Sequence, residues 1–447
     1  MYARPQTYAL PNQLESPLRD KRLSFIPTAA MFLLGAATGY PIQVVGRIYP
    51  GELALALIAL VAFIGLFSMP KSLRSQVLIL LGAMLIGFIG YVLSDIYRGT
   101  EVKDYVRGWS RWVFMILNFL ALVKLTYRQP KYLLAFMLGF SAVNGALPFL
   151  SPGLGRGFLF TWKFYLSVPI SIFAVWILGN RHPKTTALCM FGLAVLNAGM
   201  DYRSMALVCL LTAGLVYLAG KVKDSGGSQL SLRATGLIWA ALTLCMCVWG
   251  AIFIVQKYAE IHNLSDRQVR SSTRRLAIAK STFEIIGQSP FIGYGSWARN
   301  PQLAKLQDKM IEKLKAVDTR GELRKDVVIA HSQVLQTWIE GGILGVLFCI
   351  VFGFQLGFAG VNLGLRRPYN ALVPFYAFIL WNSTWHLLFS PFKGTQRIFI
   401  PVACVVIVQI AYDMSLLRSV SSAREWLQNY WRQAMAPRPN YGQVDAH

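Results

Sequence analysis

The sequence has few charged residues, and acidic residues are the scarcer kind. Only 14% of its 447 residues are charged, with 20 Asp and Glu against 44 Lys and Arg, whereas 55% are hydrophobic. So little charge cannot cover a soluble surface of this size, which excludes a soluble globular protein. The predicted fold class is an all-α polytopic membrane protein.

Motifs that bind metals and nucleotides are also absent. The sequence has no P-loop, no H-E-x-x-H, no Cys-x-x-Cys pair, no dinucleotide-binding G-x-G-x-x-G and no D-x-D pair. We therefore expect neither a metal nor a cofactor. All six cysteines fall in hydrophobic runs, so none is expected to form a disulfide in an exported loop. The first twenty residues are polar and contain proline, so no cleavable signal peptide is expected.

Long hydrophobic runs dominate what is present. Runs of about 17 to 25 residues can cross a bilayer as helices, and they predict about twelve spans. The spans are 25–41, 52–69, 76–94, 110–126, 132–150, 160–179, 185–200, 203–220, 234–256, 340–362, 371–389 and 396–414. Lys and Arg gather in alternate connections and at both ends, which predicts cytoplasmic termini in a bacterial inner membrane. The long loop after the ninth span would then face the periplasm.

These patterns divide the chain into three parts. Residues 1–256 hold the first nine spans, 257–332 form a periplasmic loop domain, and 333–447 hold the last three spans and a cytoplasmic tail. Within the loop, helices are expected at 271–286 and 301–317. The second is amphipathic, so we expect it to pack on protein, although a role in gating substrate access stays open.

Positive charge on the outer side needs an explanation, because topology predicts its depletion there. The formal net charge of +24 otherwise reflects topology and contact with anionic membrane lipids, so no nucleic-acid partner is expected. The outer cations include Arg47, Arg98, Lys103, Arg107, Arg156, Arg203, Lys393 and Arg397, with Arg267, Arg270, Arg274, Arg275 and Arg299 in the long loop. Such a set favours a pyrophosphate-like substrate. For any single residue, contact with a lipid headgroup is the alternative.

His331 lies where the long loop meets a hydrophobic span. With a reference pKa of about 6.5, an imidazole can accept a proton at neutral pH. Nearby arginines would lower this pKa and keep the ring neutral. His331 is therefore the best candidate for a catalytic base, with a capping or packing role as the alternative.

Three further sequence elements form a set. The segment that begins at His331-Ser332 continues through Leu335, Gln336, Glu340, Gly342 and Gly345. Arg275 is followed by Pro290, Gly293 and Gly295, and Tyr202-Arg203-Ser204 stands at the start of a span. The set resembles the H-[NS]-x-x-L-Q-x-x-x-E-x-G-x-x-G, R-x(14)-P-x-x-G-x-G and S-R-[GS] elements of the O-antigen ligase and polymerase superfamily of bacterial membrane glycosyltransferases, with tyrosine in place of serine in the last.

The resemblance implies transfer of a glycan from an undecaprenyl pyrophosphate carrier to an acceptor hydroxyl. We expect a ligase that transfers O-antigen polysaccharide to the lipid A core, and our hypothesis for the mechanism is direct displacement with inversion at the anomeric carbon. His331 would act as the base, and Arg203 and Arg275 would bind the pyrophosphate with support from Arg270 or Arg274. Gln336 would contact sugar hydroxyls or form a hydrogen bond between helices. For Glu340 we favour a structural ion pair. The alternatives are a polymerase that extends carrier-linked repeats and a transporter of lipid-linked glycan, which has no use for a base.

Overall fold

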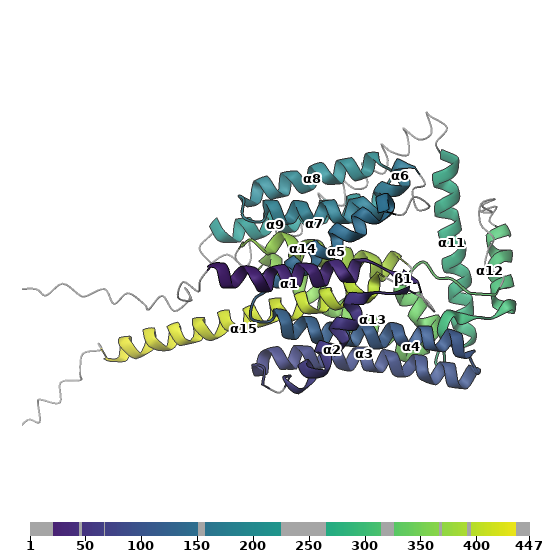
Figure 1. Cartoon of the computed structure of the whole chain (residues 1–447), viewed down its shortest axis with the longest axis horizontal. Coiled ribbons are helices and arrows are strands. Elements are labelled where there is room, and N and C mark those ends of the chain that lie inside the picture. Colours follow the sequence, from purple (N-terminus) through teal and green to yellow (C-terminus); the bar gives the residue numbers. More distant parts are fainter. Residues whose placement is uncertain are drawn as a thin grey trace, which may run out of the picture.

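The computed structural model describes residues 21–43, 47–66, 68–150, 157–224, 265–313, 326–365, 369–390 and 395–434, and it is almost entirely helical there (Figure 1). The N-terminal part contains α1 (Lys21–Gly39), α2 (Pro50–Ile64), α3 (Lys71–Arg98), α4 (Val102–Thr126), α5 (Lys131–Leu150), α6 (Phe158–Thr161), the π-helical η2 (Trp162–Leu166), α7 (Ser167–Leu178), α8 (Pro183–Gly199) and α9 (Arg203–Asp224). The C-terminal part contains α11 (Ser265–Gln288), the 3-10 turn η3 (Ser296–Ala298), α12 (Pro301–Lys313), α13 (Gln333–Leu365), α14 (Val373–Phe389) and α15 (Gln396–Ala434).

The helices confirm the predicted all-α class. Within the described ranges the strands are β1 (Ile42–Gln43) and β2 (Arg47–Ile48), which form a short antiparallel pair between α1 and α2. Every predicted span coincides with a helical segment except 234–256, which lies outside the described residues. Seven helices in the described part are long and apolar enough to cross a membrane, and α1 and α2 hold shorter apolar stretches.

Close helix crossings hold the bundle together. In α1 and α5, an added Cβ at Gly35 would overlap the carbonyl oxygen of Phe136, and one at Gly139 would overlap that of Phe32. Glycines thus let these backbones approach each other, as is common between membrane helices. Helix α3 packs on both α4 and α13, and α14 contacts α9, α13 and α15. The polar network described below joins α3, α4 and α13.

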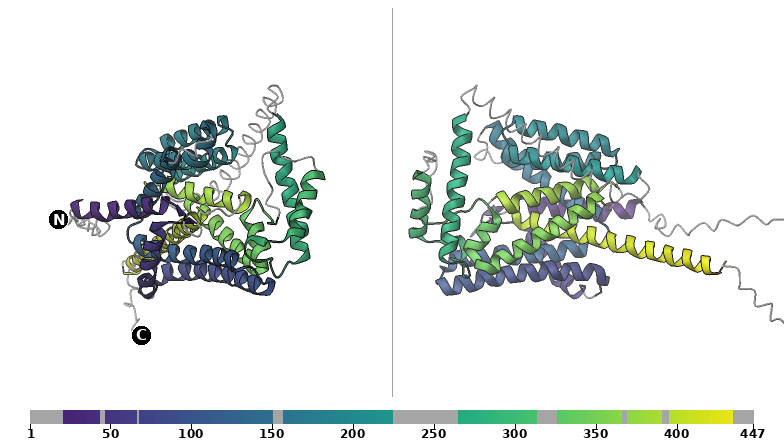
Figure 2. Two further views of the ribbon diagram at one scale, coloured as in Figure 1. Left: turned by 45° about the vertical axis from the view of Figure 1, so that its right-hand side comes forward. Right: turned by 180° about the vertical axis from the view of Figure 1, so that it is seen from behind.

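Two loop helices lie across one end of this bundle. Figure 1 and Figure 2 show α11 and α12 side by side there, whereas the N-terminal end of α1 and the C-terminal end of α15 lie at the other end. They correspond to the helices predicted at 271–286 and 301–317, although α11 begins earlier and the described part of α12 ends at Lys313. Leu303, Ala304 and Ile311 of α12 are buried. Helix α12 therefore packs on protein, as its amphipathic pattern predicts.

Candidate active site

A pocket of about 340 Å³ lies where the two loop helices meet the chain that leads into α13. It is lined by Arg274, Arg275 and Ile278 of α11, Gln307 and Ile311 of α12, and Ile329 and His331. The structure thus brings together three residues that the sequence singled out, His331, Arg274 and Arg275. One imidazole and two guanidinium groups share a pocket that is partly walled by isoleucines, where reduced solvent contact strengthens electrostatic interactions.

The extended segment before His331 is fixed along its backbone. The Val328 N–H donates to the carbonyl oxygen of Ala298 at 3.2 Å. The side chain of Gln307 accepts from the Ile329 N–H at 3.2 Å and donates to the Ile329 carbonyl at 3.0 Å. Val328 is also fully buried. Residues 326–330 consequently have little freedom to move the imidazole that follows them.

The residues on either side of His331 are held as well. Gln336 reaches back one turn, and its Oε1 accepts from the buried Ala330 N–H at 2.8 Å. Ser332 caps α13, because its Oγ accepts from the Leu335 N–H at 3.4 Å. His331, itself half-buried, therefore projects from a short turn between two anchored positions.

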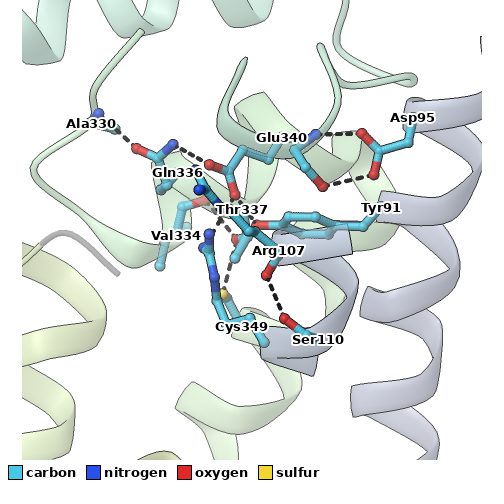
Figure 3. A network of polar contacts seen from close by, with 12 residues as sticks. Tyr91, Asp95, Arg107, Ser110, Ala330, Val334, Gln336, Thr337, Glu340 and Cys349 are labelled. Carbon is cyan, nitrogen blue, oxygen red and sulfur yellow. Dashed lines mark hydrogen bonds and ion pairs between the residues drawn. The ribbon is translucent and has the colours of Figure 1, made fainter. Parts of the chain in front are cut away.

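A buried polar network lies directly behind this turn (Figure 3). Glu340 is 1% exposed. Its Oε1 accepts from Gln336 Nε2 at 2.7 Å, and its Oε2 accepts from the Tyr91 hydroxyl at 2.7 Å. Arg111 of α4 completes the network with its Nη1 3.4 Å from Oε2. This arrangement agrees with the structural ion pair that we favoured for Glu340.

Sequence reasoning missed Arg111. The signal was its position just inside the predicted span 110–126, since an ionisable residue in a membrane helix usually has a partner or a function. The Arg111 guanidinium also lies 5.1 Å from the ring of Trp297, whose backbone has a φ of 68°. Arg111 thus connects α4 to both α13 and the turn η3.

The two longest motifs of the resemblance form one structural unit. Helix α13 breaks at Gly342, which has φ 63° and ψ −155°. The freed carbonyl oxygens of Ile339 and Glu340 accept from the Tyr294 N–H at 2.7 Å and the Gly295 N–H at 3.1 Å. The Pro290 to Gly295 stretch therefore closes on the first part of α13 and satisfies its exposed backbone groups.

Replacing Gly342 with alanine is expected to destabilise the protein. A left-handed φ costs about 1–3 kcal/mol for a residue with a Cβ. The new Cβ would also overlap the Phe291 carbonyl oxygen and lie 2.8 Å from the Gly293 nitrogen. Thermal unfolding in detergent should show a lower Tm. Gly357→Ala in the same helix, where the Cβ meets open space, is the control and should leave the Tm nearly unchanged. Equal Tm values for the two variants would contradict this role.

Several of the outer arginines are used inside the protein. Arg98 donates from Nε to the Gly293 carbonyl at 3.0 Å and from Nη2 to Ser289 Oγ at 2.7 Å. Arg299 donates from Nε to Asp104 Oδ2 at 2.8 Å, a hydrogen bond that raises the pKa of its guanidinium and keeps it charged. Binding of a polyanionic substrate therefore does not explain every outer cation.

A second buried ion pair uses another of these cations. The Nη2 atom of Arg397 lies 2.8 Å from Glu52 Oε2, and both side chains are nearly inaccessible to solvent. The Asn118 amide donates to the Arg397 carbonyl at 3.1 Å. This group joins α2, α4 and α15, so Arg397 stabilises helix packing.

Arg203 does not line the pocket. It begins α9, and its Nε lies 3.8 Å from Asp201 Oδ1 with 42% of the side chain exposed. The turn between α8 and α9 lies at the same end of the bundle as α6 and α11 (Figure 1). The side chain of Arg270 falls outside the described part of the chain.

Asp308 of α12 interacts electrostatically with Arg274, one of the residues that line the pocket. Burial raises the pKa of Asp308, neighbouring Glu312 raises it further, and Arg274 acts in the opposite direction. Asp308 is thus more readily protonated than an ordinary aspartate. Its protonation would leave more of the positive charge of Arg274 available to an anionic ligand.

A larger pocket of about 540 Å³ lies at the other end of the bundle. It is lined by Ser68, Met69, Pro70, Tyr127, Arg128 and Tyr412. This lining has one guanidinium and no imidazole, so it lacks a group that can accept a proton at neutral pH. The smaller pocket contains an imidazole and two guanidinium groups, and it is therefore the candidate active site.

Comparison with known proteins agrees with the resemblance of the motifs. Residues 185–350 match the family model described as O-antigen ligase, whereas no curated protein matches the chain. The matched region runs from α8 past the break in α13, so it includes Arg203, Arg275, His331 and Glu340. This matched region, which contains the candidate active site, belongs to the O-antigen ligase family.

Proposed function

We propose that the protein is an inverting, metal-independent glycosyltransferase that transfers O-antigen polysaccharide from undecaprenyl pyrophosphate to the lipid A core. One observation carries this proposal. His331, Arg274 and Arg275 line a single pocket within the region that matches the O-antigen ligases. A base and two cations are what such a transfer needs, because a pyrophosphate is a good leaving group once its charge is met.

In the proposed reaction the acceptor hydroxyl gives its proton to His331. The acceptor oxygen then bonds to the anomeric carbon while the bond from that carbon to the pyrophosphate oxygen breaks. The electron pair leaves with undecaprenyl pyrophosphate, and attack from the opposite face inverts the anomeric configuration. Arg275 and Arg274 bind the phosphate oxygens, where a guanidinium can form two parallel hydrogen bonds. Arg203 and Arg270 are proposed as further cations, the first from its motif and the second from its place in the N-terminal part of α11.

We further propose about twelve spans, cytoplasmic termini and a periplasmic pocket, with the three parts 1–256, 257–332 and 333–447. The pocket lies between α11 and α12, at the end of the bundle opposite the N-terminal end of α1 and the C-terminal end of α15. This arrangement fits the proposed orientation. A lipid-linked pyrophosphate lies at the membrane surface, so its carrier chain can stay in the bilayer while its phosphates reach the loop helices. Membrane lipids surround the exposed apolar side chains of the bundle.

Lipid A core is preferred over a second carrier-linked repeat as the acceptor. The core is anionic, so it supplies a second ligand for outer cations such as Lys280 and Arg107, which lie exposed at this end. A polymerase would use the same base and pyrophosphate contacts. A transporter of lipid-linked glycan would need the cations but not His331.

Purified protein with carrier-linked glycan should release undecaprenyl pyrophosphate and form glycosylated lipid A core. EDTA should leave the rate unchanged, because side chains meet the pyrophosphate charge. The assay offers lipid A core and a second carrier-linked repeat in parallel, and the products are identified by mass spectrometry. Extension of the repeat alone would indicate the polymerase. Movement of the donor between leaflets without release would indicate the transporter, and inhibition by EDTA would indicate a metal-dependent mechanism.

A further inference from the structure

The backbone amide directly before the proposed base is held by a glutamine that is itself anchored in a buried charged network. Gln336 Oε1 accepts from the Ala330 N–H at 2.8 Å, and Gln336 Nε2 donates to Glu340 Oε1 at 2.7 Å. We propose that Gln336 is a positioning residue for His331, with Glu340 as its anchor. The proposal rests on the proposed function, in which His331 is the base.

The anchor is fixed from two other helices. Glu340 Oε2 accepts from the Tyr91 hydroxyl of α3 at 2.7 Å (Figure 3). The same oxygen lies 3.4 Å from Arg111 Nη1 of α4. All of these groups are buried, and hydrogen bonds are stronger where water is excluded. Gln336 consequently cannot rotate without breaking a hydrogen bond at both ends of its amide. The position of the Ala330 backbone is thereby tied to the ends of α3 and α4.

Two glutamine side chains, one from α12 and one from α13, hold the backbone directly before His331. Gln307 of α12 binds both backbone groups of Ile329, and Gln336 of α13 binds the N–H of Ala330. The imidazole of the next residue then projects into the pocket beside the arginines. General-base catalysis requires hydrogen-bond reach to the acceptor hydroxyl, so a small displacement of this backbone reduces the rate. A buried ion pair costs desolvation energy, and here it secures one conformation near the chemistry.

The Gln336→Met variant tests the positioning role. Methionine keeps the length of the side chain but cannot hold the Ala330 N–H. The kcat should fall roughly tenfold to a hundredfold, as expected for a misplaced catalytic group, while KM for the lipid-linked donor stays unchanged. The matched control is Gln409→Met in α15. Gln409 is equally buried and accepts from the Tyr376 hydroxyl at 2.7 Å, at the other end of the bundle.

Comparison of the two variants separates positioning from simple stability. Both should lower Tm, because each removes the partner of a buried polar group. Only Gln336→Met should lower the kcat of the folded protein. A normal kcat in Gln336→Met, or an equal loss in Gln409→Met, would overturn the proposal.

A rescue variant tests the anchor. Glu340→Gln combined with Arg111→Met removes both charges, so no unpaired charge remains buried. Its new glutamine can still accept from Gln336 Nε2, and the double variant should therefore keep a kcat close to that of the natural protein. A kcat as low as that of Gln336→Met would show that the charged pair acts in another way than by holding Gln336.

Chemical modification gives a readout that does not depend on transfer. Diethyl pyrocarbonate labels accessible imidazoles, and mass spectrometry reports the rate at His331. This rate should change in Gln336→Met and stay the same in Gln409→Met. If the natural protein shows no transfer, the proposed function fails, yet the labelling rate still decides whether Gln336 positions the imidazole. An unchanged rate would refute the positioning role whatever the activity.

Discussion

Glycan transfer should be almost abolished when His331 is replaced by alanine, with a loss of about 10² to 10⁴ in rate. The reason is that His331 is the one imidazole among the described residues that line the pocket, next to the arginines that would bind the leaving group. Donor binding should persist in this variant, since Arg274 and Arg275 are unchanged. The expected signature is thus a loss of kcat with retention of labelled undecaprenyl pyrophosphate-linked glycan.

The control for this variant is His182→Ala. His182 is exposed and caps the start of α8, where its Nδ1 accepts from the Lys184 N–H at 3.3 Å. It lies far along the chain from the pocket lining, and its loss should not reduce transfer. The rate of product formation and the equilibrium binding of donor are measured for both variants and the natural protein. Near-normal transfer by His331→Ala would refute its role as the base.

Changing Arg275 to lysine should reduce transfer by about 10² to 10³, although the positive charge is retained. Lysine cannot form the two parallel hydrogen bonds that a guanidinium makes with phosphate oxygens. Arg275 is exposed at the mouth of the pocket, whereas Arg274 is half-buried and also interacts electrostatically with Asp308. Arg275 is therefore the freer of the two to engage a ligand.

The same substitution at Arg128 serves as the comparison for Arg275→Lys. Arg128 is exposed and lines the larger pocket at the opposite end of the bundle, so Arg128→Lys should leave the rate unchanged. Initial rates at several donor concentrations distinguish a loss of binding from a loss of turnover. Full activity of Arg275→Lys would mean that a single positive charge suffices at position 275. It would refute the proposal that the Arg275 guanidinium binds phosphate oxygens through two parallel hydrogen bonds.

The helices could be predicted from the sequence because their signals are local. A hydrophobic run of sufficient length in a membrane protein forms a helix, since no other element satisfies its backbone in lipid. The helices at 271–286 and 301–317 were also recognisable from capping residues and amphipathic spacing. Their ends differed, with α11 beginning at Ser265, because local sequence signals define the ends of a helix less well than its interior.

The partners of the polar residues could not be predicted in the same way. Arg111 and Glu340 lie in different predicted spans, and only the packing of α4 against α13 and η3 brings them together. The roles of Arg98 and Arg299 in holding the loop likewise depend on contacts between distant segments. Lys and Arg counts indicate which side of the membrane a loop occupies, but they do not distinguish a substrate ligand from a structural ion pair.

The glycines around the break in α13 are a further case in which the sequence did not indicate the contacts. An added Cβ at Gly341 would lie 2.7 Å from the ring of Tyr91, so this glycine lets α13 approach α3 closely. The left-handed backbone at Gly342 had no separate signal in the sequence. The same holds for the hydrogen bonds that join Ile339, Glu340 and Ile343 to the Phe291–Gly295 stretch. The motif resemblance was informative here, since its two longest parts meet in space.

The most direct test of the account is a structure of the protein with undecaprenyl pyrophosphate bound. The pyrophosphate should lie in the pocket between α11 and α12, with its oxygens within hydrogen-bond distance of the Arg275 guanidinium and its sugar-bearing end toward His331. A pyrophosphate bound away from this pocket, or one with His331 on the far side of the arginines, would contradict the proposed displacement.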